Sequence, residues 1–353
     1  MNDHELLGRA RALLQAVEAE YAPDPRLAVF EVEVDVEDGV LSLLGMTSEP
    51  AAAEAIHRRL ALLDARLAVR DAVLRLPDAE LAQRAHAVVT AAVAPMLAAP
   101  QINHTQVSQV VLGSRLLLLR QHGRWLHCRT PAGYLGWVHR GYLRRLDETQ
   151  ARAWELGAGG AVHLSLGAEL LDDAGAPFLR LPWGARVVRA ADGRVHLPDG
   201  RAGHARGELL PLAERARCFP PHGEAVAETA RRWLGSPYLW GGVTPAGIDC
   251  SGFVQALLRL HGVELPRDSD QQAQAGEPLE PGEGFENLRA GDLLFFAEDA
   301  GRVTHVTLCT GGPNIIHASL GNGGVARNRL TGTLAYEQEL RRLFVCARRI
   351  VES

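Results

Sequence analysis

Apolar and polar residues near the N-terminus follow first a helical and then a strand-like pattern. The stretch VFEVEVDVEDGVLSLLG, which begins at Val29, alternates apolar with acidic residues up to Asp38-Gly39, a pair typical of tight hairpin turns. Helical patterns flank this hairpin over residues 4–20 and 48–63, and VRDAVLRLP, which begins at Val69, has the pattern of a third strand. The order α-β-β-α-β predicts a small α+β domain.

Residues 79–94 are rich in alanine and predict a helix, which we expect to close an N-terminal domain of residues 1–95. Short apolar runs follow, interrupted by turn sequences such as His122-Gly123 and Pro131-Ala132-Gly133. Short strands separated by regularly spaced turns are typical of a small all-β barrel. The sequence therefore predicts a first barrel over residues 96–147.

A second barrel is predicted over residues 158–214, after the helical stretch TQARAWEL. The segment GYLGWVHRGYL of the first barrel and the segment GRAGHARGEL of the second align when one residue is deleted, which indicates a weak internal repeat. The second copy has Arg201 and His204 where the first has Tyr134 and Trp137. Only the first barrel keeps aromatic residues there, so we expect the first barrel to be the one that contacts a substrate.

The C-terminal region contains the most informative stretch of the chain, GSPYLWGGVTPAGIDCSGFVQALLRLHGV. Apolar residues recur at helical spacing from Phe253 to Leu258, and Gly262 is placed to end the helix. Cys250 is therefore expected at a helix N-terminus, where unpaired N–H groups and the helix dipole lower a thiol pKa from its usual value of about 8.5. The main-chain N–H of Cys250 could also stabilise a developing oxyanion.

Two histidines on a predicted hairpin supply a base for this thiol. The stretch VTHVTLCTGGPNIIHAS has its turn at residues 311–314, so its two strands bring His305 and His317 close together. His305 would accept the thiol proton, and His317 would hold the second nitrogen of His305 in the correct tautomer, as in a Cys-His-His triad. Each residue alone is more typical of a buried structural side chain. Their joint occurrence favours catalysis.

Composition excludes several classes of function. The formal net charge is −5, from 37 Lys and Arg against 42 Asp and Glu, and no basic run supports nucleic-acid binding. Every Lys/Arg position is Arg, which excludes lysine nucleophiles and Schiff-base chemistry. The five cysteines are scattered and contain no C-x-x-C pair, so no disulfide framework is expected. Without a signal-peptide pattern or a membrane-spanning stretch, we expect a cytoplasmic protein.

Residues 220–350 resemble the NlpC/p60 cysteine peptidases of bacterial cell walls. The stretches PYLWGG, DCSGFVQ, PRDSDQQ and GDLLFF, and the histidines of THV and IIHAS, occur in the order typical of that family. The resemblance implies a papain-like α+β fold with Cys250, His305 and His317 as the triad. It also implies that Tyr238 lies beside the thiol and helps to polarise the scissile carbonyl.

Two SH3-like barrels before such a domain resemble the subgroup that cleaves γ-D-glutamyl-L-diamino-acid bonds in peptides with a free N-terminal L-Ala. The resemblance implies that Asp249 pairs with the substrate ammonium, although a carboxylate at this position is also typical of a structural N-cap. The subgroup often has an acidic residue before the proline that opens the first barrel, where this chain has Ala99. This departure weakens the expected preference for a free amine.

Other substrate contacts implied by the same resemblance come from Ser251, Ser269 and Tyr134. Ser269 could equally cap the helix that follows it. Arg267 could bind substrate, or it could form a buried pair that holds Asp249 in place. These residues complete the expected site.

The expected fold class is multidomain. It comprises a small α+β domain that resembles a BON domain, two SH3-like β-barrels and a papain-like α+β catalytic domain at residues 218–353. The expected function is hydrolysis of the γ-D-glutamyl-L-diamino-acid bond of muropeptides or peptidoglycan stem peptides through a thioester on Cys250, with no metal or cofactor. A thiol amidase or acyltransferase of the same fold, and a non-catalytic wall-binding protein, are the alternatives. The sequence does not specify an oligomeric state.

Overall fold

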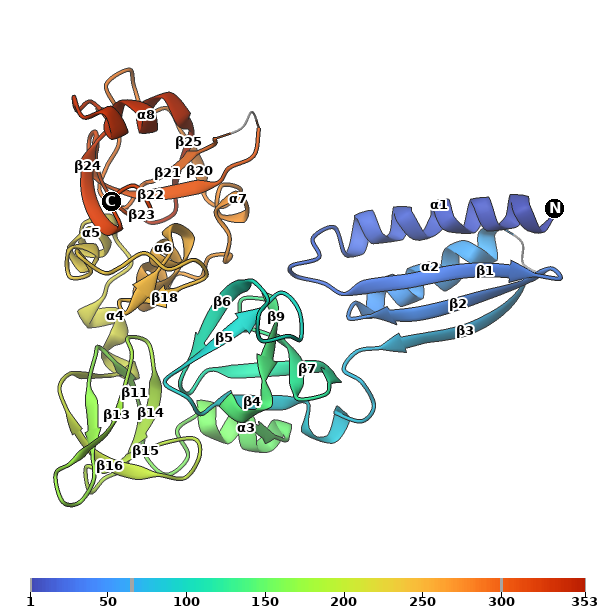
Figure 1. The fold of residues 1–353 in the computed structure, drawn as a ribbon, viewed down its shortest axis with the longest axis horizontal. Coiled ribbons are helices and arrows are strands. Elements are labelled where there is room, and N and C mark those ends of the chain that lie inside the picture. The colour runs from blue at the N-terminus through green and yellow to red at the C-terminus, as the bar shows by residue number, and fades with distance from the viewer. Residues whose placement is uncertain (1, 64–66, 299–300, 353) are drawn as a thin grey trace.

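The computed structural model describes residues 2–63, 67–298 and 301–352. Near the N-terminus, two helices pack together against a three-stranded sheet of order β1-β2-β3, in which β1 and β2 are antiparallel and β2 and β3 are parallel (Figure 1). Asp38 and Gly39 have φ values of 51° and 74°, the left-handed conformation that a tight hairpin turn requires. The elements of this N-terminal unit are α1 Asp3–Tyr21, β1 Phe30–Glu37, β2 Val40–Thr47, α2 Pro50–Leu63 and β3 Ala68–Arg75.

The helix predicted over residues 79–94 is wrong. The structure has a single 3-10 turn there, η1, followed by the strands β4 and β5. Strand β4 lies between β10 and β7, and β5 pairs with β6, so strand pairing with distant residues overrides the helix propensity of alanine. The all-β region therefore begins about ten residues before the predicted boundary at residue 96.

Two antiparallel β units follow, each with seven strands in the described residues. Their strand orders are β10-β4-β7-β8-β9-β5-β6 and β13-β12-β16-β15-β14-β11-β17, and each encloses its own apolar core. The first β unit comprises η1 Ala82–Arg84, β4 His86–Val89, β5 Val93–Leu97, β6 Gln106–Val111, β7 Arg115–His122, β8 Trp125–Arg129, β9 Leu135–His139, η2 Arg140–Tyr142 and β10 Leu143–Leu146. The second comprises β11 Ala161–Ser165, β12 Glu169–Leu171, β13 Pro177–Arg180, β14 Arg186–Arg189, β15 Val195–His196, β16 Ala202–Arg206, β17 Leu209–Pro211 and η3 Leu212–Glu214.

The helix α3 (Glu148–Glu155) joins these β units, as the sequence predicts, and begins at a capping box of Asp147 and Gln150. Leu112 of the first β unit is buried in the core of the second. The main-chain N–H of Arg186 donates to the Leu112 carbonyl at 2.9 Å. The two β units therefore share packing and hydrogen bonds.

The C-terminal unit is built on a six-stranded sheet of order β20-β25-β21-β22-β23-β24. Alternate residues of β21 face opposite sides of this sheet, so Leu293 and Phe295 pack in one core and Leu294 and Phe296 in the other. Helix α6 covers the first face and α8 the second. The elements are α4 Arg215–Cys218, α5 Gly223–Arg231, β18 Val243–Thr244, β19 Gly247–Ile248, α6 Cys250–Leu260, α7 Ser269–Gln272, β20 Glu277–Leu279, β21 Leu293–Phe296, β22 His305–Gly311, β23 Asn314–Ser319, β24 Gly324–Arg329, α8 Ala335–Leu343 and β25 Phe344–Arg349.

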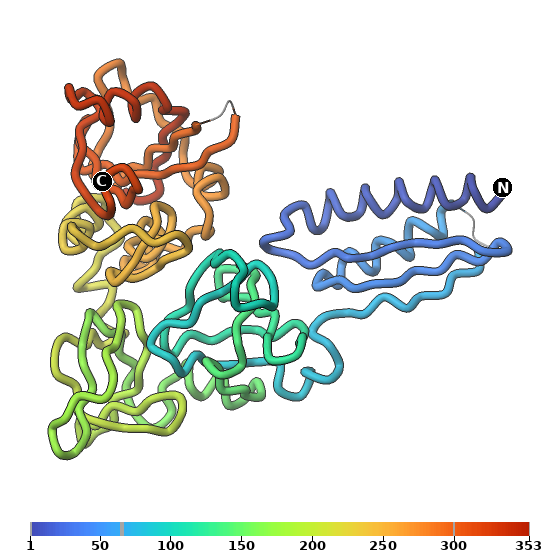
Figure 2. The backbone as a smooth tube through the Cα atoms, viewed as in Figure 1, coloured from blue at the N-terminus to red at the C-terminus, as the bar shows by residue number. Residues whose placement is uncertain are grey.

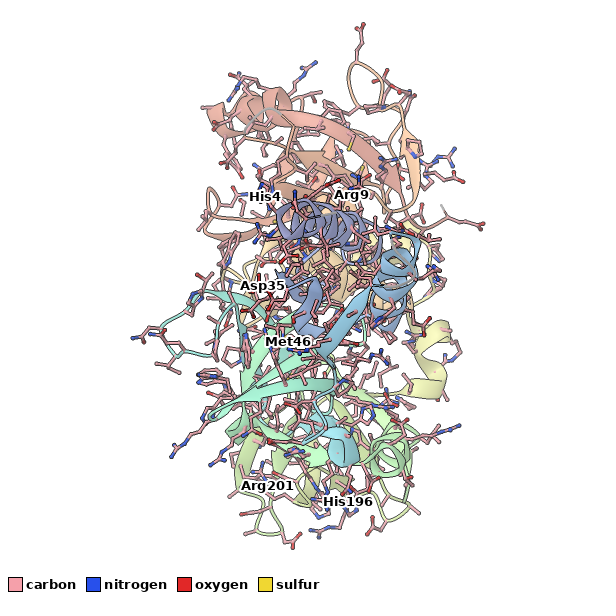
Figure 3. The ribbon with its side chains drawn as sticks, turned by 90° about the vertical axis from the view of Figure 1, so that its right-hand side faces the viewer. His4, Arg9, Asp35, Met46, His196 and Arg201 are labelled. Carbon is pink, nitrogen blue, oxygen red and sulfur yellow. The ribbon has the colours of Figure 1, made fainter. Side chains whose placement is uncertain are left out.

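The four units form a bent chain of bodies in which the N-terminal unit projects to one side (Figure 2). In the side view, His4, Arg9 and Asp35 of this unit lie in front of the C-terminal unit, and Arg201 of the second β unit lies far below (Figure 3). The loop after α1 turns back toward the first β unit and α7 (Figure 1). The N-terminal unit therefore contacts the rest of the molecule mainly through the end from which this loop emerges.

Arg26 in that loop joins three units. Its guanidinium donates at 2.8 Å each to the carboxylates of Asp268, the N-cap of α7, and Asp270, within α7, and it also donates to Asp24. Its carbonyl accepts from the main-chain N–H of Leu135 in the first β unit at 2.8 Å. These bonds fix the N-terminal unit next to the residues that precede α7.

Candidate active site

Cys250 is the first residue of α6, as the sequence predicts. Asp249 is the N-cap, and its Oδ1 accepts from the Gly252 N–H at 2.7 Å. The thiol is buried in the core between α6 and the sheet, against the main-chain N–H groups of Val306 and Ser251. Val306 directly follows His305 in β22, so the thiol lies against the strand that carries this imidazole.

The two predicted histidines are in direct contact. The distance between His305 Nε2 and His317 Nδ1 is 2.7 Å, and His317 Nε2 lies 3.0 Å from Asn328 Oδ1. The Asn328 oxygen also accepts from Asn322 Nδ2 at 2.8 Å, whereas Asn322 Nδ2 lies 3.3 Å from His317 Nε2, so we assign the Nε2 proton of His317 to the shorter bond with Asn328. His317 Nδ1 is then an acceptor for the Nε2–H of His305.

This hydrogen-bond chain leaves Nδ1 of His305 with a free lone pair. A neutral imidazole has one donor and one acceptor nitrogen, and the donor of His305 is occupied by His317. The acceptor nitrogen is therefore available to take a proton from the thiol. Asn328, in β24, fixes this arrangement, and the sequence analysis missed it because β24 was not assigned.

The contact between the histidines is diagonal and not directly across the strands. Leu308 pairs with Ile316, and an irregularity between Cys309 and Gly311 shifts the register of the hairpin. The imidazoles still meet because diagonal neighbours on one face of a sheet lie within reach of large side chains. His317 is fully buried and stacks on Tyr336, with 6.1 Å between ring centroids.

Burial determines the protonation of the pair. It raises the pKa of Cys250 to about 12, and the carboxylate of Asp249 acts in the same direction. Burial also lowers the pKa of His305 well below its usual 6.5, and lowers that of His317 to about 4. The predicted lowering of the Cys250 pKa by the helix N-terminus is therefore wrong, because loss of solvent outweighs the helix dipole. The resting pair is a neutral thiol and a neutral imidazole.

Asp249 is occupied by protein donors. Arg267 donates to both of its carboxylate oxygens, at 3.1 and 2.7 Å, and the Gly241 N–H donates to Oδ2 at 2.8 Å. Ser251 donates to Oδ1 at 3.4 Å and accepts from Arg267 at 2.8 Å. The side chains of Arg267 and Asp249 are only 2% and 8% exposed. These contacts are those expected if Asp249 is a structural N-cap and Arg267 is its buried partner, which were the alternatives to a role in substrate binding.

Tyr238 is half-buried and packs against the core that contains Cys250. Burial raises the pKa of Tyr238, and the nearby Cys250 and Asp249 add to this effect, so the phenol is protonated at neutral pH. A protonated phenol beside the thiol can donate a hydrogen bond to a bound carbonyl.

The first β unit reaches the C-terminal unit through Tyr134. Its hydroxyl donates to Asp268 at 3.1 Å, and Asp268 directly precedes the buried Ser269 at the start of α7. Asp268, not Ser269, is the N-cap of α7. The Asp268 side chain is 25% exposed, and burial raises the pKa of Asp268 even though Arg267 and Arg26 act against it. Asp268 was missed in the sequence because its partners come from two other units.

No group of three or more His, Cys, Asp or Glu side chains within the described ranges is arranged to hold a metal ion. The helices in these ranges include none that is long and apolar enough to cross a membrane. Cys128, Cys309 and Cys346 lie in strands, and all five cysteines are free. Cys250 is the one that begins a helix.

Comparison with known proteins gives a family match over part of the chain. Residues 235–343 match the model of the NlpC/P60 family. The gamma-D-glutamyl-L-lysine dipeptidyl-peptidase of Bacillus subtilis is 29% identical over 247 residues, which cover 66% of this chain and 78% of that protein. A protein of Bacillus cereus with the same name is 36% identical over 128 residues, 35% of this chain and 37% of that protein. Dipeptidyl-peptidase 6 of Lysinibacillus sphaericus is 27% identical over an alignment that covers 69% of this chain and 92% of that protein.

Solved structures agree on the fold. An NlpC/P60 family protein from Bacillus cereus superposes with a TM-score of 0.62 at 22% identity, covering 75% of this chain and 99% of that one. An NlpC/P60 endopeptidase from Photobacterium damselae superposes with a TM-score of 0.53 at 17% identity. The superposition covers 76% of this chain and 74% of that one. In each case about a quarter of this chain has no counterpart.

Proposed function

We propose, from the premise that this chain carries an NlpC/P60 domain, that it is a cysteine peptidase that hydrolyses the γ-D-glutamyl-L-diamino-acid bond of peptidoglycan-derived peptides. The observation that carries the proposal is the hydrogen-bond chain from Asn328 through His317 to His305, which leaves a basic nitrogen for the Cys250 proton. The printed names of the relatives from Bacillus subtilis and Bacillus cereus support the choice of bond.

In the proposed reaction, the thiol of Cys250 attacks the γ-carbonyl of the D-Glu residue while Nδ1 of His305 takes the thiol proton. Because the Cys250 thiol and the His305 imidazole are both neutral at rest, no thiolate is formed beforehand. The proton therefore moves to His305 as the sulfur attacks. In this mechanism, the main-chain N–H of Cys250 and the phenol of Tyr238 stabilise the oxyanion. His305 then protonates the leaving amine, and water hydrolyses the thioester and restores the thiol.

We propose that a free N-terminal ammonium binds between Asp268 and Tyr134, and not at Asp249. Asp249 already accepts hydrogen bonds from Arg267 and two main-chain N–H groups, so an ammonium there would have to displace a protein donor. Asp268 also accepts from Arg26 and Tyr134, but its side chain is 25% exposed, and because burial raises its pKa an added cation would stabilise its charged form. This carboxylate would compensate for Ala99, where the resembling subgroup often has an acid.

The finer domain assignments belong to the same proposal. We propose that the N-terminal unit is BON-like, because its elements follow the order α-β-β-α-β. The two antiparallel β units are proposed to be SH3-like barrels, because each closes a core of its own with short strands. In this interpretation the first barrel supplies Tyr134 to the substrate.

The test is cleavage of L-Ala-γ-D-Glu-L-Lys, with a free and with an acetylated N-terminus, followed by mass spectrometry. We expect the wild type to release L-Ala-D-Glu and lysine from the free peptide, and Cys250→Ala to release nothing. Asp268→Asn should lower the preference for the free over the acetylated peptide about tenfold, in line with the loss of one charge-assisted hydrogen bond. No cleavage of either peptide by the folded wild type would contradict the proposed function.

A further inference from the structure

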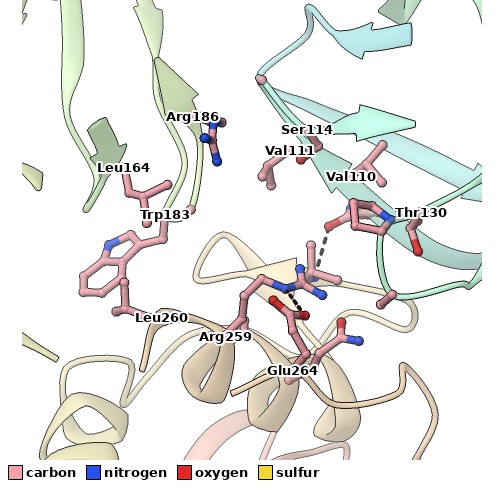
Figure 4. A pocket seen from close by; sticks show the side chains of 18 of the residues that line it. Val110, Val111, Ser114, Thr130, Leu164, Trp183, Arg186, Arg259, Leu260 and Glu264 are labelled. Carbon is pink, nitrogen blue, oxygen red and sulfur yellow. Dashed lines mark hydrogen bonds and ion pairs between the residues drawn. The ribbon is translucent and has the colours of Figure 1, made fainter. Parts of the chain in front are cut away.

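A cavity lies where the two β units meet α6 (Figure 4). Its volume is about 350 Å³, which is within the range of pockets that hold small molecules. The helix α6 contributes residues from Gln255 to Leu260, and Cys250 does not line the cavity. At about 1.5 Å per residue, that lining segment is roughly 8–15 Å along the helix from the thiol. The cavity does not contain the thiol, but it borders the candidate site, because Tyr134 and Arg267 also line it.

One wall of the cavity is apolar. Val110 of the first β unit, Leu164 and Trp183 of the second, and Leu260 of α6 all face it (Figure 4). Trp233, which is 3% exposed, also lines the cavity, and its ring meets that of Trp183 edge to face with 5.4 Å between centroids. This wall suits the apolar body of a small molecule.

The charged residues of the lining are mostly positive. Two are carboxylates, Glu155 and Glu264. Three of the guanidinium groups have carboxylate partners, at Glu155, Glu264 and Asp249. The five arginines of the lining are Arg115, Arg186, Arg215, Arg259 and Arg267.

Two arginines of the cavity lack a carboxylate partner among the described residues. Arg186 donates from Nη2 to the main-chain oxygen of Glu155, and Arg215 donates to the main-chain oxygen of Arg259 at 3.2 Å. Burial lowers the pKa of Arg186, and the nearby Glu155 carboxylate, which forms no ion pair with it, acts in the opposite direction. The lining therefore holds positive charge that the protein does not neutralise.

Two buried N–H donors of the lining also have no partner in the described parts of the chain. These are Nε of Arg186 and Nε1 of Trp233. Buried donors are rarely left unpaired in folded proteins, since each unmade bond costs about 1–3 kcal/mol. A ligand with acceptor oxygens would pair with either donor only after a small shift of its side chain, because neither nitrogen is accessible to solvent.

We propose that this cavity binds a small monocarboxylate with an apolar body. The carboxylate pairs with Arg186, whose planar fork matches its two oxygens, and the apolar body lies against Trp183 and Trp233. Glu155 and Glu264 in the same lining disfavour a doubly charged phosphate. This assignment does not rest on the proposed peptidase activity, because none of its residues is the thiol or a histidine of the candidate active site.

The test uses the full-length protein and two probes that differ in one group, N-acetyl-L-phenylalanine and its neutral amide. Isothermal titration calorimetry should show that the wild type binds the carboxylate at least tenfold more tightly than the amide. Arg186→Gln should abolish this difference. Arg189→Gln, an exposed arginine on the same strand, should leave it unchanged.

Because Arg186 lies at the junction of the β units, thermal melting is measured for each variant. If Arg186→Gln does not fold, Trp233→Phe, which removes the Nε1 donor and keeps an aromatic ring, takes its place and should weaken carboxylate binding severalfold. Equal binding of the two probes, unchanged binding by a folded variant, or no binding by the wild type up to 10 mM probe would each overturn the proposal.

Discussion

At the residue scale, the side chain of Asn328 decides which nitrogen of His305 carries the proton. Its Oδ1 accepts from His317 Nε2, and that bond leaves His317 Nδ1 to accept from His305. Removing the acceptor would allow His317 to adopt the other tautomer. The proton of His305 would then move from Nε2 to Nδ1. Asn328 is a positioning residue in the proposed mechanism.

We expect Asn328→Leu to lower kcat of peptide cleavage by about tenfold or more with little change in KM, since substrate does not contact this residue. Asn328→Asp keeps an acceptor and should retain more activity. Its carboxylate should also raise the pKa of His317 and move the acid limb of the pH profile upward. Asn103→Ala, in an exposed turn, is the control. A pH profile of Asn328→Asp identical to the wild type would contradict this role.

The lowered pKa of His305 predicts that activity is lost on the acid side of the pH profile only at an unusually low pH. His305 must be neutral to accept the thiol proton, so activity is lost as the pH falls through the pKa of His305 in the folded protein. Since burial holds this pKa well below 6.5, kcat/KM should be maintained as the pH falls through 6.5 and should decline only in more acidic solution. The measurement is kcat/KM between about pH 4 and 8. A half-maximal value at or above pH 6.5 would be inconsistent with the buried, neutral pair.

At the element scale, the start of α6 depends on the pair of Asp249 and Arg267. Asp249 caps the helix, and Arg267, from the segment before α7, neutralises it and also donates to Ser108 of the first β unit at 3.0 Å. Removing one partner of such a buried pair leaves an uncompensated charge. This pair therefore couples the position of the thiol to two other elements.

Asp249→Ala should lower the free energy of unfolding by about 3–5 kcal/mol, because Arg267 would remain buried without a counter-ion. Chemical denaturation measures this change. Asp173→Ala removes an exposed carboxylate that pairs with Arg194 and should change stability by less than about 1 kcal/mol. A similar small effect for both variants would show that the buried pair does not hold the helix start.

At this scale, prediction from the sequence succeeds where neighbouring residues determine whether a segment forms a helix or a strand and where that element begins. The start of α6 follows from Asp249 and the apolar spacing behind it, and both are local signals. The helix expected over residues 79–94 fails because pairing with distant strands decides the conformation there. The meeting of His305 and His317 is predictable from the hairpin, but the shift near Cys309 is not, since a β-bulge leaves no clear mark in the sequence.

At the scale of the whole molecule, units that are distant in sequence share one corner beside the candidate active site. Arg26 of the N-terminal unit and Tyr134 of the first β unit both bind Asp268. No sequence pattern predicts these contacts, because they depend on how folded units dock. The candidate triad could therefore be predicted from the sequence, whereas the carboxylate proposed for the substrate amine could not.

Arg26→Ala should loosen the N-terminal unit, because it removes bonds to Asp24, Asp268 and Asp270 at one point. Small-angle scattering should show a larger radius of gyration for this variant than for the wild type, and the cost in stability should be on the order of 1–2 kcal/mol. Arg9→Ala, which breaks an exposed pair within α1, is the matched control. Identical scattering of the two variants would mean that Arg26 does not anchor the unit.

The central claim is that Cys250, deprotonated by His305, is the nucleophile. The most direct test is labelling with an L-Ala-γ-D-Glu peptide in which an electrophilic ketone replaces the scissile amide, followed by peptide mapping. The account predicts one adduct per chain, on Cys250, with strongly reduced labelling in His305→Ala and normal labelling in His122→Ala. An adduct on any of the other four cysteines, or labelling of Cys250 that does not depend on His305, would contradict it.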